Sequence, residues 1–172
     1  MNFVFISPQF PKNYWHFCDR LKRRGVNVLA IGDTPYDALG DQLIQSVTEY
    51  YRVDDMEDEK QMIKAMGYFI HQYGKIDWLE SNNEYWLEMD ARLRTAFNIT
   101  TGMQIQHINE FKLKSEMKHY YEKAGVKSAR YHLVATLEEG KTFIKEVGYP
   151  VIVKPNNGVG AAKTYRLDRK SV

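Results

Sequence analysis

Short runs of β-forming residues alternate with helix-length segments through the N-terminal part of the chain. The four predicted strands cover residues 3–6, 26–31, 47–53 and 76–79. The first run is apolar at every position, which is typical of a strand buried on both faces of a sheet. Between the second and third runs, residues 33–35 predict only a turn. Strands that alternate with helices in this order predict a parallel, doubly wound sheet of the α/β class.

Helical patterns fill the segments between these strands. A first helix is predicted to begin with Asn13 as its cap and to end at Gly25. An amphipathic helix is predicted over residues 57–73, where Gly74 ends it, and another over 84–97. The inner face of the amphipathic helix carries Met62, Met66, Phe69, Ile70 and Tyr73.

The pattern changes over residues 100–110, where a polar connection follows the last of these helices. We place a domain boundary here, with a Rossmann-like domain at 1–108 and a smaller α+β domain at 109–172. The predicted elements of the second domain are a helix over 112–123, a strand over 129–134, a helix opened by Thr136 with Glu139 in capping-box position, and strands over 151–154 and 163–167. Because residues 168–172 match no recognisable element, we expect this domain to be incomplete at its C-terminus.

Charge and composition exclude several classes of partner. The 24 Lys and Arg residues nearly balance 22 Asp and Glu residues, so no strong field points to a nucleic acid or an anionic membrane. The sequence has neither a signal-peptide pattern nor an apolar run of about 18 residues, and we expect a cytoplasmic protein. The single cysteine, Cys18, permits no intrachain disulfide, and the five histidines show no metal-ligand spacing. No metal ligand is therefore predicted within the chain.

A loop of small residues follows the strand at 151–154, which its apolar sequence predicts to be buried. Lys154 ends this strand, and Lys163 closes the loop. Gly158 and Gly160, with two alanines after them, allow backbone N–H groups to approach an anion closely. Because the lysines add positive charge beside those N–H groups, the loop can cradle a polyphosphate.

Two better-known phosphate motifs do not fit this stretch. The Rossmann fingerprint needs a glycine where Lys163 stands, and the Walker A pattern needs glycines at Asn157 and Ala162. Both motifs also require a helix next, whereas residues 164–167 favour a strand. A plain β-hairpin, whose asparagines and glycines satisfy turn geometry, is the alternative interpretation. The residues alone leave both interpretations open.

The order of several elements resembles the start of the ATP-grasp fold. The matching features are Lys114, a helix ending in Ala124-Gly125-Val126, and Gly148-Tyr149-Pro150-Val151-Ile152-Val153-Lys154 followed by the glycine loop. The resemblance covers about residues 109–167, and residues 1–108 are similar to the family's pre-ATP-grasp domain. Two departures are Leu113, where the family commonly has Asp, and a loop with fewer glycines.

The resemblance implies roles for individual residues. Lys114 would contact nucleotide phosphate, and Lys154 would contact phosphate and adenine. The loop would fold over the β- and γ-phosphates, and its implied binding residues are Asn156, Asn157, Gly158, Val159, Gly160, Ala161 and Ala162. No catalytic residue is implied within the chain.

The resemblance also implies an activity, an ATP-dependent carboxylate–amine or carboxylate–thiol ligase that acts through an acyl phosphate. ATP and Mg²⁺ would be its cofactors and an unidentified carboxylate its substrate. The Mg²⁺ ligands are expected downstream of residue 172, so we expect the chain alone to bind ATP weakly and to show no turnover. The alternative is a non-catalytic module that senses a ligand or forms a homodimer. A dinucleotide-dependent oxidoreductase ranks last, because Ser7-Pro8-Gln9 replaces the glycine fingerprint after the first strand.

Polar residues also follow the fourth predicted strand, where doubly wound sheets place ligands. They are Glu80, Ser81, Asn82, Asn83, Glu84, Glu88 and Asp90. One interpretation is that they contact substrate. The other is that Asn82 or Asn83 caps the next helix while Glu84 and Glu88 lie on its solvated face, which is the commoner use of such residues.

Overall fold

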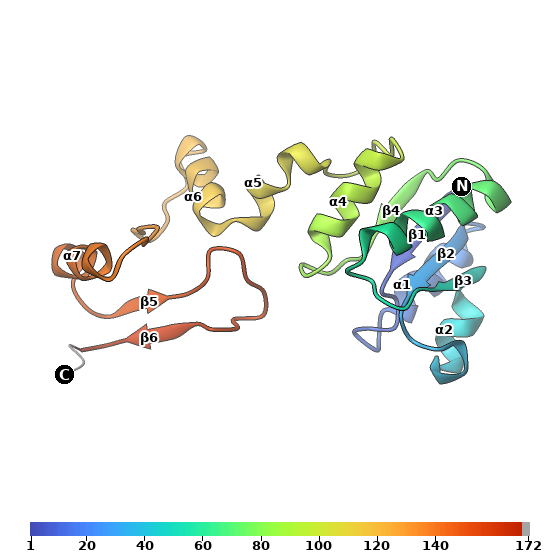
Figure 1. Ribbon diagram of the computed structural model, residues 1–172, viewed down its shortest axis with the longest axis horizontal. Coiled ribbons are helices and arrows are strands. Elements are labelled where there is room, and N and C mark those ends of the chain that lie inside the picture. Colours follow the sequence, from blue (N-terminus) through green and yellow to red (C-terminus); the bar gives the residue numbers. More distant parts are fainter. Residues whose placement is uncertain (170–172) are drawn as a thin grey trace. The chain divides into compact units, whose positions relative to one another are not determined.

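The computed structural model describes residues 1–169 and shows two compact units (Figure 1). Unit 1 is Met1–Ile108, and unit 2 begins at Asn109. Unit 1 contains a four-stranded sheet and unit 2 a two-stranded one. No helix within residues 1–169 is both long enough and apolar enough to cross a lipid bilayer.

The sheet of unit 1 is parallel throughout. Its strands are β1 (Asn2–Ile6), β2 (Asn27–Gly32), β3 (Glu49–Arg52) and β4 (Trp78–Glu80), in the spatial order β3-β2-β1-β4. All five residues of the central strand β1 are buried, and the four at positions 3–6 form the apolar run that predicted burial. The predicted α/β class and parallel sheet are confirmed.

Helices cover both faces of this sheet. On one face lie α1 (Trp15–Lys22) and α2 (Asp41–Ser46), and on the other lie α3 (Glu59–Tyr73) and α4 (Leu87–Ala96). The first core includes Phe3, Phe5, Cys18, Val28, Ala30 and Leu43, and the second includes Val4, Ile6, Leu29, Met66, Phe69 and Leu79. Because successive strand residues point to opposite faces, β1 contributes to both cores.

Some element boundaries in unit 1 differ from the predictions. Asn13 does not cap α1; its carbonyl oxygen accepts from the N–H of His16 in a turn, and the helix begins at Trp15. The short helix η1 (Tyr36–Ala38) and then α2 follow the segment where only a turn was predicted. The amphipathic helix α3 was predicted well, since Asp58 caps it and Gly74 ends it with a φ of 81°.

Unit 2 is smaller and more open. Its elements are α5 (Asn109–Lys112), α6 (Lys114–Lys123), α7 (Leu137–Val147), β5 (Val151–Val153) and β6 (Tyr165–Leu167). The capping box of Thr136 and Glu139 is present at the start of α7, and β5 pairs antiparallel with β6, as predicted. The predicted strand over 129–134 is wrong. That segment has no strand to pair with among the described residues, and Lys118 instead donates to the carbonyl oxygen of Ala129 at 2.6 Å.

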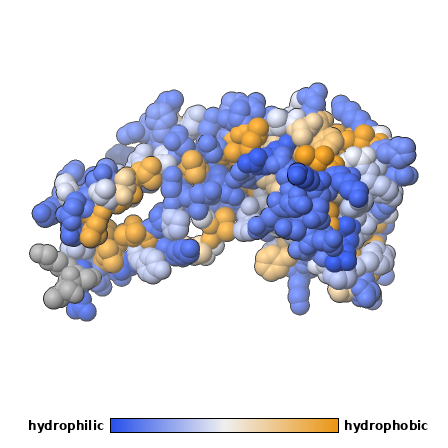
Figure 2. Space-filling view, in the orientation of Figure 1, coloured by the Kyte–Doolittle hydropathy of each residue, from blue (hydrophilic) through white to orange (hydrophobic). Residues whose placement is uncertain are grey.

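The strand before the glycine loop was expected to be buried, and this expectation is also wrong. Ile152 is 55% exposed and Val153 is 49% exposed. Because β5 pairs with β6 alone among the described residues, neither face of this hairpin is fully buried. None of residues 109–169 is buried, and apolar groups reach the surface of this unit (Figure 2). Exposed apolar surface of this kind is typical of a face that packs against other protein.

Candidate functional site

The glycine-rich loop connects β5 to β6 and has an unusual backbone. Gly160, Ala161 and Lys163 have positive φ values of 62°, 57° and 54°. Residues in this left-handed region, mixed with right-handed ones, turn successive N–H groups toward one side and form a concavity for anions. The residues that the described loop presents therefore suit a phosphate group.

Lys114 lies against this loop, although it stands at the start of α6. Its Nζ donates to the carbonyl oxygen of Gly158 at 2.6 Å, across 44 positions of sequence. The fold thus brings together the lysine and the loop that the sequence resemblance grouped as one phosphate site. The ammonium group is half-buried and is held by a neutral acceptor, which an anionic phosphate oxygen would outcompete.

The other two lysines of the loop are more open. Lys154 follows β5 directly and Lys163 precedes β6, and both are exposed. An exposed ammonium on a flexible stem can reach a ligand bound at the loop without first losing a protein partner. Lys154 therefore remains a candidate phosphate contact, but as a solvated lysine and not as the end of a buried strand.

Asn156 is hydrogen-bonded to the start of α6 through its backbone and its side chain. The N–H of Lys114 donates to its backbone carbonyl oxygen at 3.1 Å. Its side chain accepts from the N–H of Ser115 at 2.9 Å and donates to the Ser115 hydroxyl at 2.9 Å. Ser115 was not among the predicted site residues, and its only sequence signal is its place beside Lys114.

Metal ligands are not grouped within the described part of the chain. Among residues 1–169, no set of three or more His, Cys, Asp or Glu side chains could hold a metal ion.

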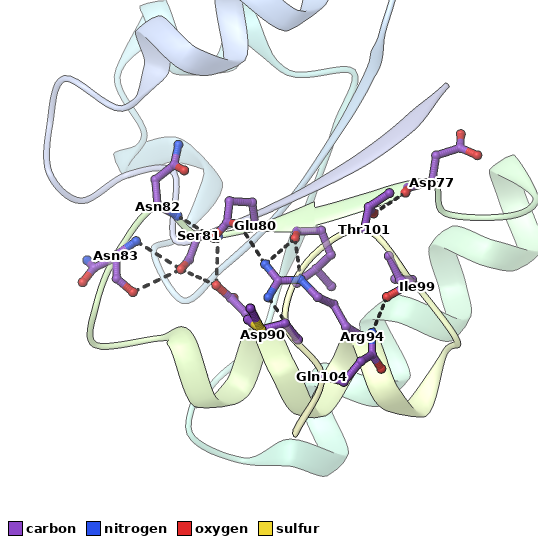
Figure 3. A network of polar contacts seen from close by, with 12 residues as sticks. Asp77, Glu80, Ser81, Asn82, Asn83, Asp90, Arg94, Ile99, Thr101 and Gln104 are labelled. Carbon is purple, nitrogen blue, oxygen red and sulfur yellow. Dashed lines mark hydrogen bonds and ion pairs between the residues drawn. The ribbon is translucent and has the colours of Figure 1, made fainter. Parts of the chain in front are cut away.

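A second polar network lies at the carboxyl end of β4 (Figure 3). Its centre is Arg94 of α4, which is 2% exposed. The Arg94 guanidinium donates to the Leu79 carbonyl through Nε at 3.0 Å and Nη2 at 2.8 Å, and Nη2 also contacts Oε2 of Glu80 at 2.8 Å. Nη1 donates to the Met103 carbonyl at 3.3 Å. Arg94 thus ties β4 to α4 and to the segment that follows it.

Gly102 fits closely against this guanidinium. A Cβ atom at position 102 would lie 2.7 Å from Nε and 2.8 Å from Cζ of Arg94. The φ of Gly102 is 121°, which side chains rarely adopt. Glycine is therefore required here both for space and for backbone conformation.

Asp90 is the most unusual carboxylate of the network. It is fully buried, and its Oδ2 accepts from the Ser81 hydroxyl at 2.6 Å and the Ser81 N–H at 3.1 Å. Its Oδ1 is buried without a hydrogen-bond partner among the described residues. Burial raises the pKa of Asp90 to about 7; the Ser81 hydrogen bond opposes the rise, and the Glu80 carboxylate adds to it.

The alternatives for residues 80–90 are partly decided by this geometry. No side chain caps α4, whose N-cap is Trp86; Asn83 instead accepts from the N–H of Tyr85 at 3.0 Å. The capping prediction is therefore wrong in its detail. Glu88 lies on the exposed face and pairs with Arg92 at 2.8 Å, as expected. Neither the burial of Asp90 nor the central place of Arg94 was predicted.

Known proteins match the chain in part. No protein-family model matches it. The alanine–anticapsin ligase of Bacillus subtilis is 29% identical over 104 residues, which are 59% of this chain and 21% of that protein. The carbamoyl phosphate synthase large chain of Micrococcus luteus is 34% identical over 67 residues, which are 37% of this chain and 6% of that protein. The chain spans about a fifth or less of the length of these relatives.

Solved structures match nearly the whole chain. The L-amino acid ligase from Bacillus licheniformis has a TM-score of 0.72 at 18% identity, over 98% of this chain and 39% of that one. The biotin carboxylase domain of the 2-oxoglutarate carboxylase from Hydrogenobacter thermophilus, a dimer in complex with MgADP, ADP and bicarbonate, has a TM-score of 0.73 at 20% identity. This match covers 96% of this chain and 37% of that one. At these identities the likeness establishes the fold.

Proposed function

This chain has the sequence relatives and the fold of the N-terminal portion of ATP-grasp ligases, and from this premise we propose that it binds the phosphates of ATP in such an enzyme. The observation that carries the proposal is the contact between Lys114 Nζ and the carbonyl oxygen of Gly158. This contact joins a lysine to a glycine loop that is distant in sequence. A β-hairpin loop that only satisfies turn geometry does not require such a lysine.

Each group of the site has a role in this proposal. The N–H groups of Gly160, Ala161 and Lys163, whose φ values are positive, bind phosphate oxygens, while the N–H of Ala162 donates to the carbonyl oxygen of Val159 at 3.2 Å within the loop. Lys114 exchanges its contact with Gly158 for a phosphate oxygen, and Lys154 reaches the nucleotide from the end of β5. The positive charge of these lysines compensates part of the charge of the polyphosphate.

The proposed reaction class is that of the similar proteins, which include an alanine–anticapsin ligase and an L-amino acid ligase. We infer that a carboxylate attacks the γ-phosphate of ATP, giving an acyl phosphate and ADP, and that an amine or thiol then displaces the phosphate. Mg²⁺, when bound, neutralises the charge that develops on the transferred group. Because residues 1–169 offer no set of metal ligands, we expect this chain alone to show no turnover.

A second candidate is association of unit 1 with a second copy of itself. A groove of about 360 Å³ is lined by residues of β1, α1 and β4 and by their neighbours. Its lining includes the aromatic residues Phe3, Phe5, Phe17 and Trp78 and the arginines Arg20 and Arg24. Phe17 and Trp78 are 47% and 40% exposed. Exposed aromatic side chains beside arginine are typical of protein interfaces, and this groove could mediate a homodimer.

Titration calorimetry with MgATP, combined with light scattering, separates the two candidates. We expect saturable binding of MgATP in roughly the millimolar range, about tenfold weaker in Lys114→Ala and in Lys154→Ala, because each loses a charged hydrogen bond. Lys127→Ala, an exposed lysine of the same unit, is the matched control and should bind as the parent chain does. The absence of any saturable heat, with a mass of two chains in scattering, would favour the association candidate. ATP-dependent release of phosphate would contradict the expected lack of turnover.

A further inference from the structure

Helix α6 begins without a cap from its own neighbourhood. Its N-cap residue is Leu113, whose side chain makes no capping hydrogen bond. The first N–H groups of a helix have no partner within the helix and need one elsewhere. Asn156 supplies it from 41 positions away, because its backbone carbonyl accepts from the N–H of Lys114 and its Oδ1 from the N–H of Ser115.

The contact between Asn156 and Ser115 is reciprocal. The Nδ2 of Asn156 donates to the Ser115 hydroxyl at 2.9 Å, while its Oδ1 accepts from the Ser115 N–H at 2.9 Å. Only this orientation of the amide satisfies both contacts, since an N–H needs an acceptor opposite it. The backbone carbonyl and both polar side-chain atoms of Asn156 therefore each make a hydrogen bond with the start of α6. These contacts fix the position and orientation of its side chain.

The position of this contact divides the loop into two parts. Asn156 and Gly158 are tied to α6, one through Ser115 and the backbone of Lys114, the other through Nζ of Lys114. Both are half-buried, whereas residues 160–163 are exposed. The base of the loop is thus fixed, and the positive-φ residues that face a ligand lie beyond it.

We propose that Asn156 is a positioning residue, which with Ser115 clasps the base of the glycine loop to the start of α6 and so sets where the phosphate-binding N–H groups lie. Its consequence for phosphate binding rests on the proposed function. The contact between Asn156 and Ser115 does not depend on that function. It assigns to Asn156 a role other than the phosphate contact that the resemblance implies, and it adds Ser115 to the site.

The test is a double-mutant cycle of Ser115→Ala and Asn156→Ala, read by amide hydrogen exchange. Asn156→Ala, which removes both side-chain contacts, should speed exchange of the amides at 114–116 and 158–163 about fivefold, as expected for the loss of a helix cap. Ser115→Ala removes only the hydroxyl contact and should have a smaller effect, and the double variant should exchange no faster than Asn156→Ala. Ser115→Thr, which keeps the hydroxyl, should restore protection. Ser128→Ala in the same unit, whose hydroxyl has only a 3.5 Å contact, should change nothing at the loop.

A second readout, MgATP affinity, separates positioning from direct contact. If Asn156 positions the loop, both Ser115→Ala and Asn156→Ala weaken binding, Asn156→Ala more strongly, and their effects do not add. If Asn156 contacts phosphate, only its own variant weakens binding, and the proposal is overturned. Unchanged exchange in both single variants, with α7 still protected, would overturn it as well. Since exchange is measured without nucleotide, the clasp can be judged even if the parent chain binds no ATP.

Discussion

Replacing Arg94 with methionine is expected to lower the free energy of unfolding of unit 1 by about 3 kcal/mol. Arg94 is 2% exposed and satisfies the carbonyl of Leu79 and the carboxylate of Glu80. Methionine fills much of the volume but leaves both acceptors without their donor, and an orphaned buried acceptor is costly. Chemical denaturation followed by tryptophan fluorescence measures the loss in unit 1 specifically, because all three tryptophans lie there.

Arg92→Met is the matched control on the same helix. The Arg92 side chain is 44% exposed and pairs with Glu88 and Glu59, and such surface pairs contribute roughly 0–1 kcal/mol. The double variant Arg94→Met/Glu80→Gln should recover part of the loss, because it removes the unpaired charge. Equal effects of Arg94→Met and Arg92→Met would contradict the central role given to Arg94.

The stability of unit 1 is expected to fall as the pH rises from about 5 to about 8, and Asp90 is the cause. Burial raises the pKa of Asp90 from an ordinary value of 3.8 to about 7, so the folded protein binds this proton more tightly than the unfolded chain does. The stabilisation is fully present below the ordinary value and is lost as the pH rises through about 7. The loss over this interval is on the order of 2–3 kcal/mol.

Asp90→Asn isolates this contribution. The amide keeps a carbonyl oxygen for Ser81 and cannot ionise. The stability of the variant relative to the parent should therefore increase by the same amount between about pH 5 and about pH 8. Contributions from groups that are the same in both proteins cancel in this difference. Glu88→Gln, on the exposed face of the same helix, should leave the pH dependence unchanged. A difference between parent and Asp90→Asn that does not vary with pH would contradict an Asp90 pKa near 7.

The sheet of unit 1 could be predicted because its signals are local. Residues 3–6 are apolar at every position, and such a run is typical of a strand buried in a parallel sheet. The small helix α2 lacked such a signal, since only Leu43 and Ser46 of its six residues are buried. The strand expected at 129–134 failed for a different reason, because a strand depends on a partner that the local sequence does not encode.

The candidate site was predictable only in its outline. Lys114 and the glycine loop were grouped through family resemblance, and the fold places them in contact. The link between Asn156 and Ser115 spans 41 positions, and no local pattern reports a helix cap from so far away. The burial of Asp90 beside Ser81 was not predicted, because aspartate is seldom buried and no local pattern indicates its enclosure.

The central claim is that the glycine loop and Lys114 bind the phosphates of ATP. The most direct test is to follow the amide chemical shifts of the chain by NMR during titration with MgATP. We predict that the largest changes fall on the amides of residues 157–163 and on Lys114, and that residues of the unit 1 sheet change little. Changes confined to unit 1, or none at MgATP concentrations of roughly 10 mM, would contradict the claim.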